Sequence, residues 1–402
     1  MKLPFPMFVC LALLAPLLGC LPSSSPPGPQ TAPVAPTILA APAGPLFNFG
    51  YWRLPVADLL SAPSPQDLFV LLDGTWTDAA GQATTFAEYL PVDCLAADAS
   101  ALLVPVDPQL FPGGGSPGTF KGQVSALLWA DDQLLSGPSV PCAFRSGAAF
   151  QVVYLRPVQD FALALQRFGL AAGQDTILNL LPALADAYFQ GYAVSFRAQP
   201  PADFYRFMRV DLLGRDPSGL GLLGLDATPG KDQGNLIPDE ILGGFSRPAR
   251  RDQQVPWGGI FLESFLAFSP TSASAGALAD PVFDDLFAAF SPELGGQPLR
   301  AADLHPDAPR YAAAQLALRT LAQLLASTVA HETGHCLGLA QVAGAPDAPH
   351  HLEDLPRHLM DEGRFRPFAE RAALDGEIEI LSRLERQYLQ AILPLPEEVS
   401  QP

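Results

Sequence analysis

The sequence HETGHCLGL occupies residues 331–339 and ends a longer segment, 308–339, that is rich in Ala and Leu and has no proline beyond its second residue. This composition predicts a long, largely buried helix. His331 and His335 are four residues apart, so a helix places both imidazoles on one face, where they can hold one metal ion. Glu332 is rotated off that face, which suits a group that contacts a water molecule rather than the metal. The spacing is the HExxH pattern, and it predicts a zinc site carried by the core of the fold.

Composition limits the possible classes of protein. The chain has 402 residues, of which 49% are hydrophobic and 16% charged, so it can bury a sizeable core and form two domains behind an unstructured leader. Its net charge of -18 argues against nucleic acid or an anionic lipid surface as an electrostatic partner. The sequence indicates no oligomeric state.

The first twenty residues have the features of an export signal. Lys2 precedes an apolar run that ends at Leu18 and is too short to span a bilayer. The following Gly19 and Cys20 complete a stretch that resembles the lipobox of bacterial lipoproteins. The resemblance implies cleavage before Cys20, lipidation of its sulfur and, because residue 22 is Pro rather than Asp, a location at the outer membrane or cell surface. An ordinary cleaved signal is the alternative.

The next two segments predict a tether and a small β domain. Residues 21–46 are rich in Pro, Ala and Ser and favour an extended chain that holds the folded body away from a membrane. Residues 47–156 contain short β-like runs between turn-rich stretches. In an oxidising compartment Cys94 and Cys142 are expected to form a disulfide within this domain. Cys336 is then single, and we expect it to pack within its helix rather than bind metal.

Residues 157–396 predict a mixed domain that begins with two segments of helical spacing, followed by strands. A Gly-rich loop within it carries three spaced oxygen ligands, Asp226, Asp232 and Asn235, which suit either a Ca²⁺ site or a solvated turn. A run of residues with strong β propensity, 257–270, precedes the predicted helix that carries His331 and His335. It is expected to form either a sheet edge that pairs with an extended peptide or a buried strand.

Two further features give a resemblance to a known family. Gly338 follows His335 by three residues, and Leu359-Met360-Asp361 lies downstream; both resemble the extended zinc motif and Met-turn of the metzincin clan of zinc metalloproteases. The resemblance covers about 157–396. It implies an α+β catalytic domain with a twisted mixed sheet, a long active-site helix and a C-terminal helix, with Met360 turning beneath the metal.

The sequence departs from the clan at the third metal ligand. The usual motif places a histidine at position 341, where this chain has Gln341, a poor zinc ligand. His358 is too close to Met360 to be the replacement, whereas the earlier histidines leave room for a loop and a turn. We expect His351 to be the third ligand, with His350 as the alternative and Glu353 or Asp354 as further choices. His305, far upstream, is expected to be a surface histidine.

Three protein ligands and one open position predict hydrolysis of peptide bonds in a protein or peptide substrate. Zinc lowers the pKa of bound water towards about 7 and polarises the scissile carbonyl, while Glu332 transfers the proton. Tyr388 is a candidate donor of a hydrogen bond to the oxyanion. Packing in the core is the simpler role for this residue. The alternative function is a surface lipoprotein in which a degenerate protease fold binds a partner.

Overall fold

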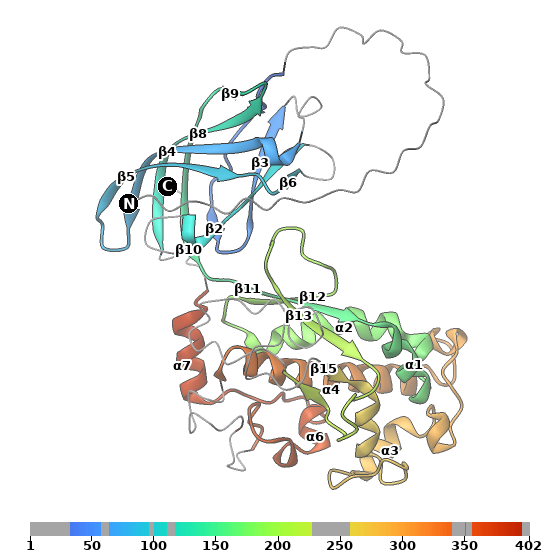
Figure 1. The fold of residues 1–402 in the computed structure, drawn as a ribbon. Coiled ribbons are helices and arrows are strands. Elements are labelled where there is room, and N and C mark those ends of the chain that lie inside the picture. Colours follow the sequence, from blue (N-terminus) through green and yellow to red (C-terminus); the bar gives the residue numbers. More distant parts are fainter. Residues whose placement is uncertain are drawn as a thin grey trace, which may run out of the picture.

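The computed structural model describes residues 33–57, 64–95, 100–110, 117–226, 258–339, 350 and 356–395. They form two domains, each with its own hydrophobic core (Figure 1). The first domain consists of strands, and the second combines a mixed sheet with helices. The predicted α+β class, with a β domain in front, is therefore confirmed. The predicted signal segment, including Cys20, lies outside the described residues.

The β domain is built from two sheets. The first sheet has the order β1 (Thr37–Ile38), β3 (Tyr51–Ala57), β7 (Ala101–Pro105), β6 (Cys94–Leu95). The second has the order β2 (Pro45–Phe47), β10 (Val140–Ala148), β8 (Gly118–Ala130), β4 (Leu68–Asp78), β5 (Ala83–Pro91), with β9 (Gln133–Ser136) also paired to β8. In β4 alternate residues are buried, beginning with Leu68, Val70 and Leu72. This period of two gives the sheet one face towards the core.

The predicted tether is too long at its C-terminal end. Ala35 and Ile38 are buried in the core of the β domain, and β1 and β2 pair with β3 and β10. Both are edge strands, where proline is tolerated because one side of the backbone needs no ladder hydrogen bond. Proline content alone therefore does not mark the end of the tether, and residues 21–32 lie outside the described residues.

The predicted disulfide between Cys94 and Cys142 is wrong in this structure. Cys142 is a buried free thiol on β10, in the second sheet, whereas Cys94 belongs to β6 of the first sheet. Burial raises the pKa of the Cys142 thiol to about 11, because the charged form is poorly solvated inside a protein. Cys142 therefore acts as a small packing residue.

A mixed five-stranded sheet forms the frame of the second domain. Its order is β12 (Val194–Arg197), β11 (Gln151–Pro157), β13 (Met208–Leu213), β15 (Gly259–Phe261), β14 (Gly224–Leu225). The first four strands are parallel, and β14 lies antiparallel to β15 at the edge. β11 was assigned to the β domain on sequence but lies inside this sheet. Its continuous apolar run is typical of a central parallel strand that is buried on both faces.

The β-prone run 257–270 does not form a sheet edge. Only Gly259–Phe261 within it is a strand, all three residues are buried, and the chain continues as a 3-10 helix over Leu262–Phe268. The buried-strand alternative is the correct one. The edge is β14, which comes from the preceding Gly-rich loop.

The helices of the second domain are α1 (Gln159–Arg167), α2 (Gln174–Asp186), α3 (Pro281–Phe287), α4 (Tyr311–Cys336), α6 (Phe368–Arg371) and α7 (Arg383–Ile392). The long α4 packs along α2, and almost all of its C-terminal half is buried (Figure 1). This confirms the predicted core helix. The C-terminal helix α7 begins at Arg383, because Ser382 and Glu385 form a capping box there.

The two domains meet through a short link and an aromatic cluster. Only residues 149 and 150 separate β10 from β11. Tyr51 N donates to Asp203 O at 2.7 Å, and Tyr205 N donates to Phe49 O at 3.0 Å. The aromatic rings that pack across this junction belong to Phe47, Phe49, Tyr51, Phe150, Phe204 and Tyr205. Across the described part of the chain, no helix is both long and apolar enough to cross a bilayer.

Candidate metal centre

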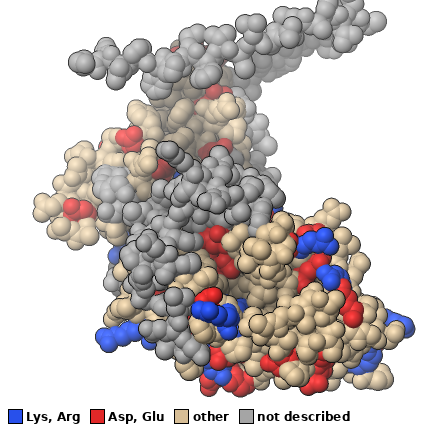
Figure 2. Space-filling model, turned by 60° about the horizontal axis from the view of Figure 1, so that its bottom comes forward, with Lys and Arg blue, Asp and Glu red and all other residues tan. Residues whose placement is uncertain are grey.

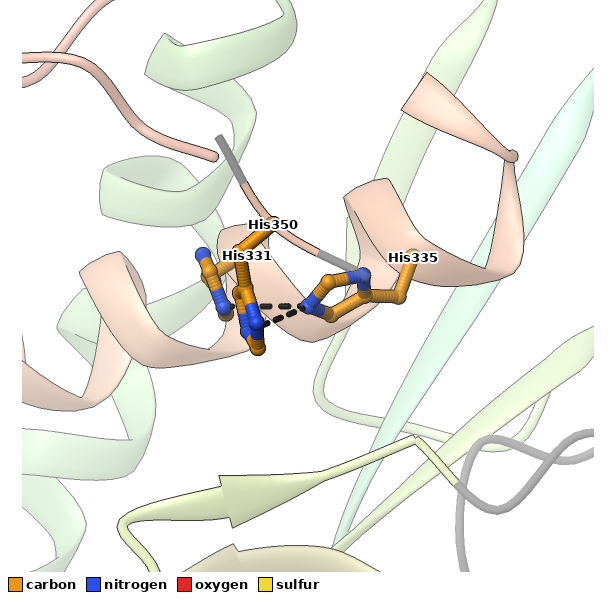
Figure 3. Close-up of side chains that lie close together, drawn as sticks. All are labelled: His331, His335 and His350. Carbon is orange, nitrogen blue, oxygen red and sulfur yellow. Dashed lines mark hydrogen bonds between the residues drawn. The ribbon is translucent and has the colours of Figure 1, made fainter. Parts of the chain in front are cut away.

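Three histidines converge at the C-terminal end of α4. His331 and His335 project from the helix, and His350 approaches from the segment that follows it (Figure 3). Nε2 of His335 lies 3.1 Å from Nε2 of His331 and 3.2 Å from Nε2 of His350. The ring planes of His331 and His350 are nearly parallel, at 12°, and each is almost perpendicular to that of His335. The ligand atoms all lie within 4.8 Å of one another.

The spacing of these nitrogens fits a metal ion. Zinc bonded to imidazole at about 2.0–2.1 Å in tetrahedral geometry separates neighbouring nitrogens by about 3.3 Å. Nδ1 of His331 lies 2.6 Å from the Leu359 carbonyl oxygen, which can only accept. Nδ1 therefore carries the hydrogen, and Nε2 presents its lone pair to the centre. Burial, with added effects of Arg366, His335 and His350, lowers the pKa of His331, which keeps the ring in its neutral, ligating form.

The structure identifies the third member of the cluster as His350, the alternative choice on sequence. The preferred His351 lies outside the described residues, as do Gln341, Glu353 and Asp354. Among the residues that the structure describes, His331, His335 and His350 are the one group of three or more side chains suited to hold a metal. The predicted helix therefore carries two of three histidines that lie close enough together to bind a metal ion.

The remaining histidines take other roles. His305 is exposed, as expected of a surface residue. His358 is buried away from the cluster, with Nδ1 3.0 Å from Oδ1 of Asp361 and Nε2 3.1 Å from Oε2 of Glu385. Burial alone would lower the pKa of His358, but the two carboxylates outweigh this effect and raise it. His358 therefore fastens the turn around Met360 to α7.

The turn at Met360 lies directly beneath the metal helix. A Cβ added to Gly334 would lie 2.4 Å from Sδ of Met360, so the methionine packs against the helix backbone between the two histidines. Gly338 has a φ of +78°, a left-handed conformation that glycine adopts at little cost and that commonly ends helices. Met360 therefore lies beneath α4, and Gly338 lies just beyond the end of that helix.

Glu332 lines a cleft of about 500 Å³ together with the edge strand β14. A Cβ on Gly224 would lie 2.5 Å from Oε1 of Glu332, so the carboxylate lies directly against the backbone of β14. The loop before β14 is organised by Asp216, which accepts hydrogen bonds from the backbone N–H groups of Ser218 and Leu222. The Ser218 hydroxyl donates to the same carboxylate, and together with the backbone bonds it outweighs burial and lowers the pKa of Asp216. The glycines of this loop therefore shape one wall of the cleft.

The sequence analysis did not identify the arginines that also line this cleft. Arg366 is buried and forms two bonds to the Glu379 carboxylate, Nε to Oε1 at 2.6 Å and Nη2 to Oε2 at 2.9 Å. Its Nη2 also donates to Ser327 Oγ of α4 at 2.7 Å. Burial opposes the charge of Glu379, yet Arg366 holds the pKa of this carboxyl below its usual value. The only feature of the sequence that could have indicated this ion pair is the group of arginines just after Met360.

Three other predictions concern residues near the cleft. Cys336 is buried, as predicted, and its Sγ donates to Oδ1 of Asp226 at 3.4 Å. Asp226 lines the cleft, but its proposed Ca²⁺ partners Asp232 and Asn235 lie outside the described residues. Tyr388 packs against the hydrophobic core and is not among the residues that line the cleft, so packing is its observed role.

Comparison with protein-family models, curated proteins and solved structures found no match for this chain. The function must therefore be argued from the geometry of the site.

Proposed function

We propose that the protein is a zinc-dependent endopeptidase of metzincin type. The observation that carries the proposal is the convergence of three imidazole Nε2 atoms beside Glu332, at the floor of an open cleft. Three neutral nitrogen ligands with a carboxylate nearby form the donor set of catalytic rather than structural zinc sites. Supporting features are the mixed sheet with an antiparallel edge strand, the glycine exit from α4 and the methionine beneath it.

Each residue at the site has a role in this proposal. A bound zinc ion would make water a better nucleophile at neutral pH and polarise the scissile carbonyl. Glu332 removes the proton from the attacking water and delivers it to the leaving amine. The edge strand β14 offers backbone groups to an extended peptide, which would pair with it as an additional strand. Leu359 orients His331 through its carbonyl, as outer-shell partners of zinc ligands do.

The place of action follows from the N-terminal sequence. We propose that the lipid carried by Cys20 holds the enzyme at the outer membrane or surface of a bacterial cell. Its substrates are then proteins or peptides of the cell envelope or surroundings. Labelling of the expressed chain with a fatty-acid probe, compared with a Cys20→Ala variant, tests this part separately.

The central test combines metal analysis with cleavage of an unfolded protein such as casein. We expect about one zinc ion per chain in the purified protein. His335→Ala should lose this zinc, whereas the matched surface variant His305→Ala should keep it. Glu332→Gln should keep zinc and lose cleavage, because only the proton carrier is removed. A folded protein that binds no zinc would overturn the proposal and favour the alternative, a degenerate protease fold that binds a partner.

A further inference from the structure

The wall of the cleft that follows Met360 carries three guanidinium groups, from Arg364, Arg366 and Arg371. Several basic residues of this domain lie beside acidic ones, as the neighbouring blue and red residues in Figure 2 show. Two of the three arginines also lie beside acidic residues. Arg364 pairs with Glu362 at 3.1 Å, and Arg366 pairs with Glu379 at 2.6 Å.

Arg371 is the exception. Its side chain is almost completely buried, at 2% exposure. Nε donates to the Arg366 carbonyl oxygen at 2.8 Å, and Nη2 donates to the Gly363 carbonyl oxygen at 3.0 Å. Within the described residues it forms no salt bridge, and Nη1 makes no hydrogen bond. Glu332 and Glu379 act on its charge only over longer distances. Among the described residues, this charged donor thus borders the cleft without a carboxylate of its own.

A buried charge without a direct partner is expensive, so its presence in a binding cleft calls for a reason. Two backbone carbonyls fix the guanidinium plane, and within the described part of the chain they leave the Nη1 end of the group without a partner. Such a fixed fork matches the geometry of a carboxylate, which accepts two parallel N–H bonds. Burial lowers the pKa of Arg371 to about 9, so the group is still charged at neutral pH.

We propose that Arg371 anchors a carboxylate subsite, so that the enzyme prefers substrates with a carboxylate close to the scissile bond. The inference rests on the proposed peptidase function and names its substrate class. Because Arg371 lines the same cleft as the histidine cluster, the carboxylate belongs to a residue near the bond that is cut. It comes either from an Asp or Glu side chain or from the C-terminus of a short peptide.

Two pairs of peptides distinguish these sources. The first pair differs only in Glu against Gln near the cleavage site, and the second differs only in a free against an amidated C-terminus. We expect one pair to show a kcat/KM ratio of about tenfold to a hundredfold in favour of the acid, the range for a hydrogen bond to a charged group. In Arg371→Met this ratio should fall to near one, while cleavage of the neutral peptide persists.

The controls separate this inference from the function on which it rests. Arg383→Met, at an exposed position of α7, should leave the ratio unchanged. Arg371→Lys keeps the positive charge but lacks the planar guanidinium group, and it replaces the Met variant if that variant does not fold. For Arg371→Lys we expect a ratio of kcat/KM values between those of the native enzyme and the Met variant. Equal cleavage of acid and neutral peptides by the native enzyme overturns the subsite but leaves the peptidase intact. If no peptide is cleaved, calorimetry with glutarate decides: binding to the native chain but not to Arg371→Met supports the subsite, and no binding overturns it.

Discussion

Gly334 lies directly against Met360: a Cβ at Gly334 would be 2.4 Å from Sδ and 3.0 Å from Cε of the methionine. The helix that carries His331 and His335 and the turn beneath it therefore touch at a point where an added methyl group would have to displace the methionine. The metal helix and the segment after it are positioned by this contact as well as by the hydrogen bond from His331 to Leu359.

Gly334→Ala should destabilise the protein by about 1–3 kcal/mol through overpacking, even though alanine favours helix by about 1 kcal/mol. The free energy of unfolding in urea measures the change. In a Met360→Ala background the steric conflict is absent, so the same substitution should become stabilising. If Gly334→Ala is destabilising in both backgrounds, Met360 does not cause the steric conflict.

His350 and His351 form a matched pair of adjacent histidines. We expect His350→Ala to weaken zinc binding by more than about a hundredfold, beyond the effect of losing an outer-shell partner. His351→Ala should leave the affinity nearly unchanged. Competition with a chelator of known affinity measures both. The reverse result would restore the ligand assignment made from the sequence.

Gly224→Ala should reduce cleavage without releasing zinc. The added methyl would lie 2.5 Å from Oε1 of Glu332 and must push the carboxylate away, and displacement of about 1 Å at a reacting group can cost about a hundredfold in rate. Gly276→Ala is the control, because the nearest atom to its Cβ lies at 3.6 Å. Unaltered kcat with retained metal would show that Glu332 tolerates the shift.

Glu379→Gln leaves Arg366 buried with its ion pair broken. Both side chains are at most 1% exposed, and breaking such a pair costs about 3–5 kcal/mol. Glu377→Gln, which removes an exposed carboxylate from Arg357, should change stability by less than about 1 kcal/mol. Thermal unfolding compares them. Similar melting temperatures for the two variants would contradict the assigned importance of the buried pair.

His358 should make stability depend on pH. Its pKa is raised above the usual 6.5 in the folded protein, where Glu385 and Asp361 outweigh burial. The folded state then binds the proton more tightly than the unfolded state, so the stabilisation is complete below pH 6.5 and is lost as pH rises through the folded pKa. The destabilisation caused by His358→Gln should therefore be larger at about pH 5.5 than at about pH 8. A destabilisation by His358→Gln that increases with pH would contradict a raised pKa of His358 in the folded protein.

The parts of this structure that depend on local pattern were predictable from sequence. Helix α4 and the pairing of His331 with His335 follow from composition and a spacing of four residues. The third histidine of the cluster does not, because no local spacing determines which histidine after the helix reaches it. Arg366 and Glu379 are 13 residues apart in the sequence, and no periodic pattern in the sequence predicts their ion pair.

The errors have a common physical origin in long-range pairing. An apolar run such as β11 shows that a strand is buried but not in which sheet, so its domain was misassigned. Cys94 and Cys142 share a domain but belong to different sheets. The edge position of β14 is set by its pairing with β15, which two residues of sequence cannot reveal.

The junction between the domains has a consequence for motion. A two-residue link, backbone hydrogen bonds across it and a packed set of aromatic rings leave little freedom for one domain to swing against the other. The two should therefore tumble in solution as one particle, with a single rotational correlation time in NMR relaxation. Whatever orients the β domain at a surface then also fixes the direction from which a polypeptide reaches the cleft.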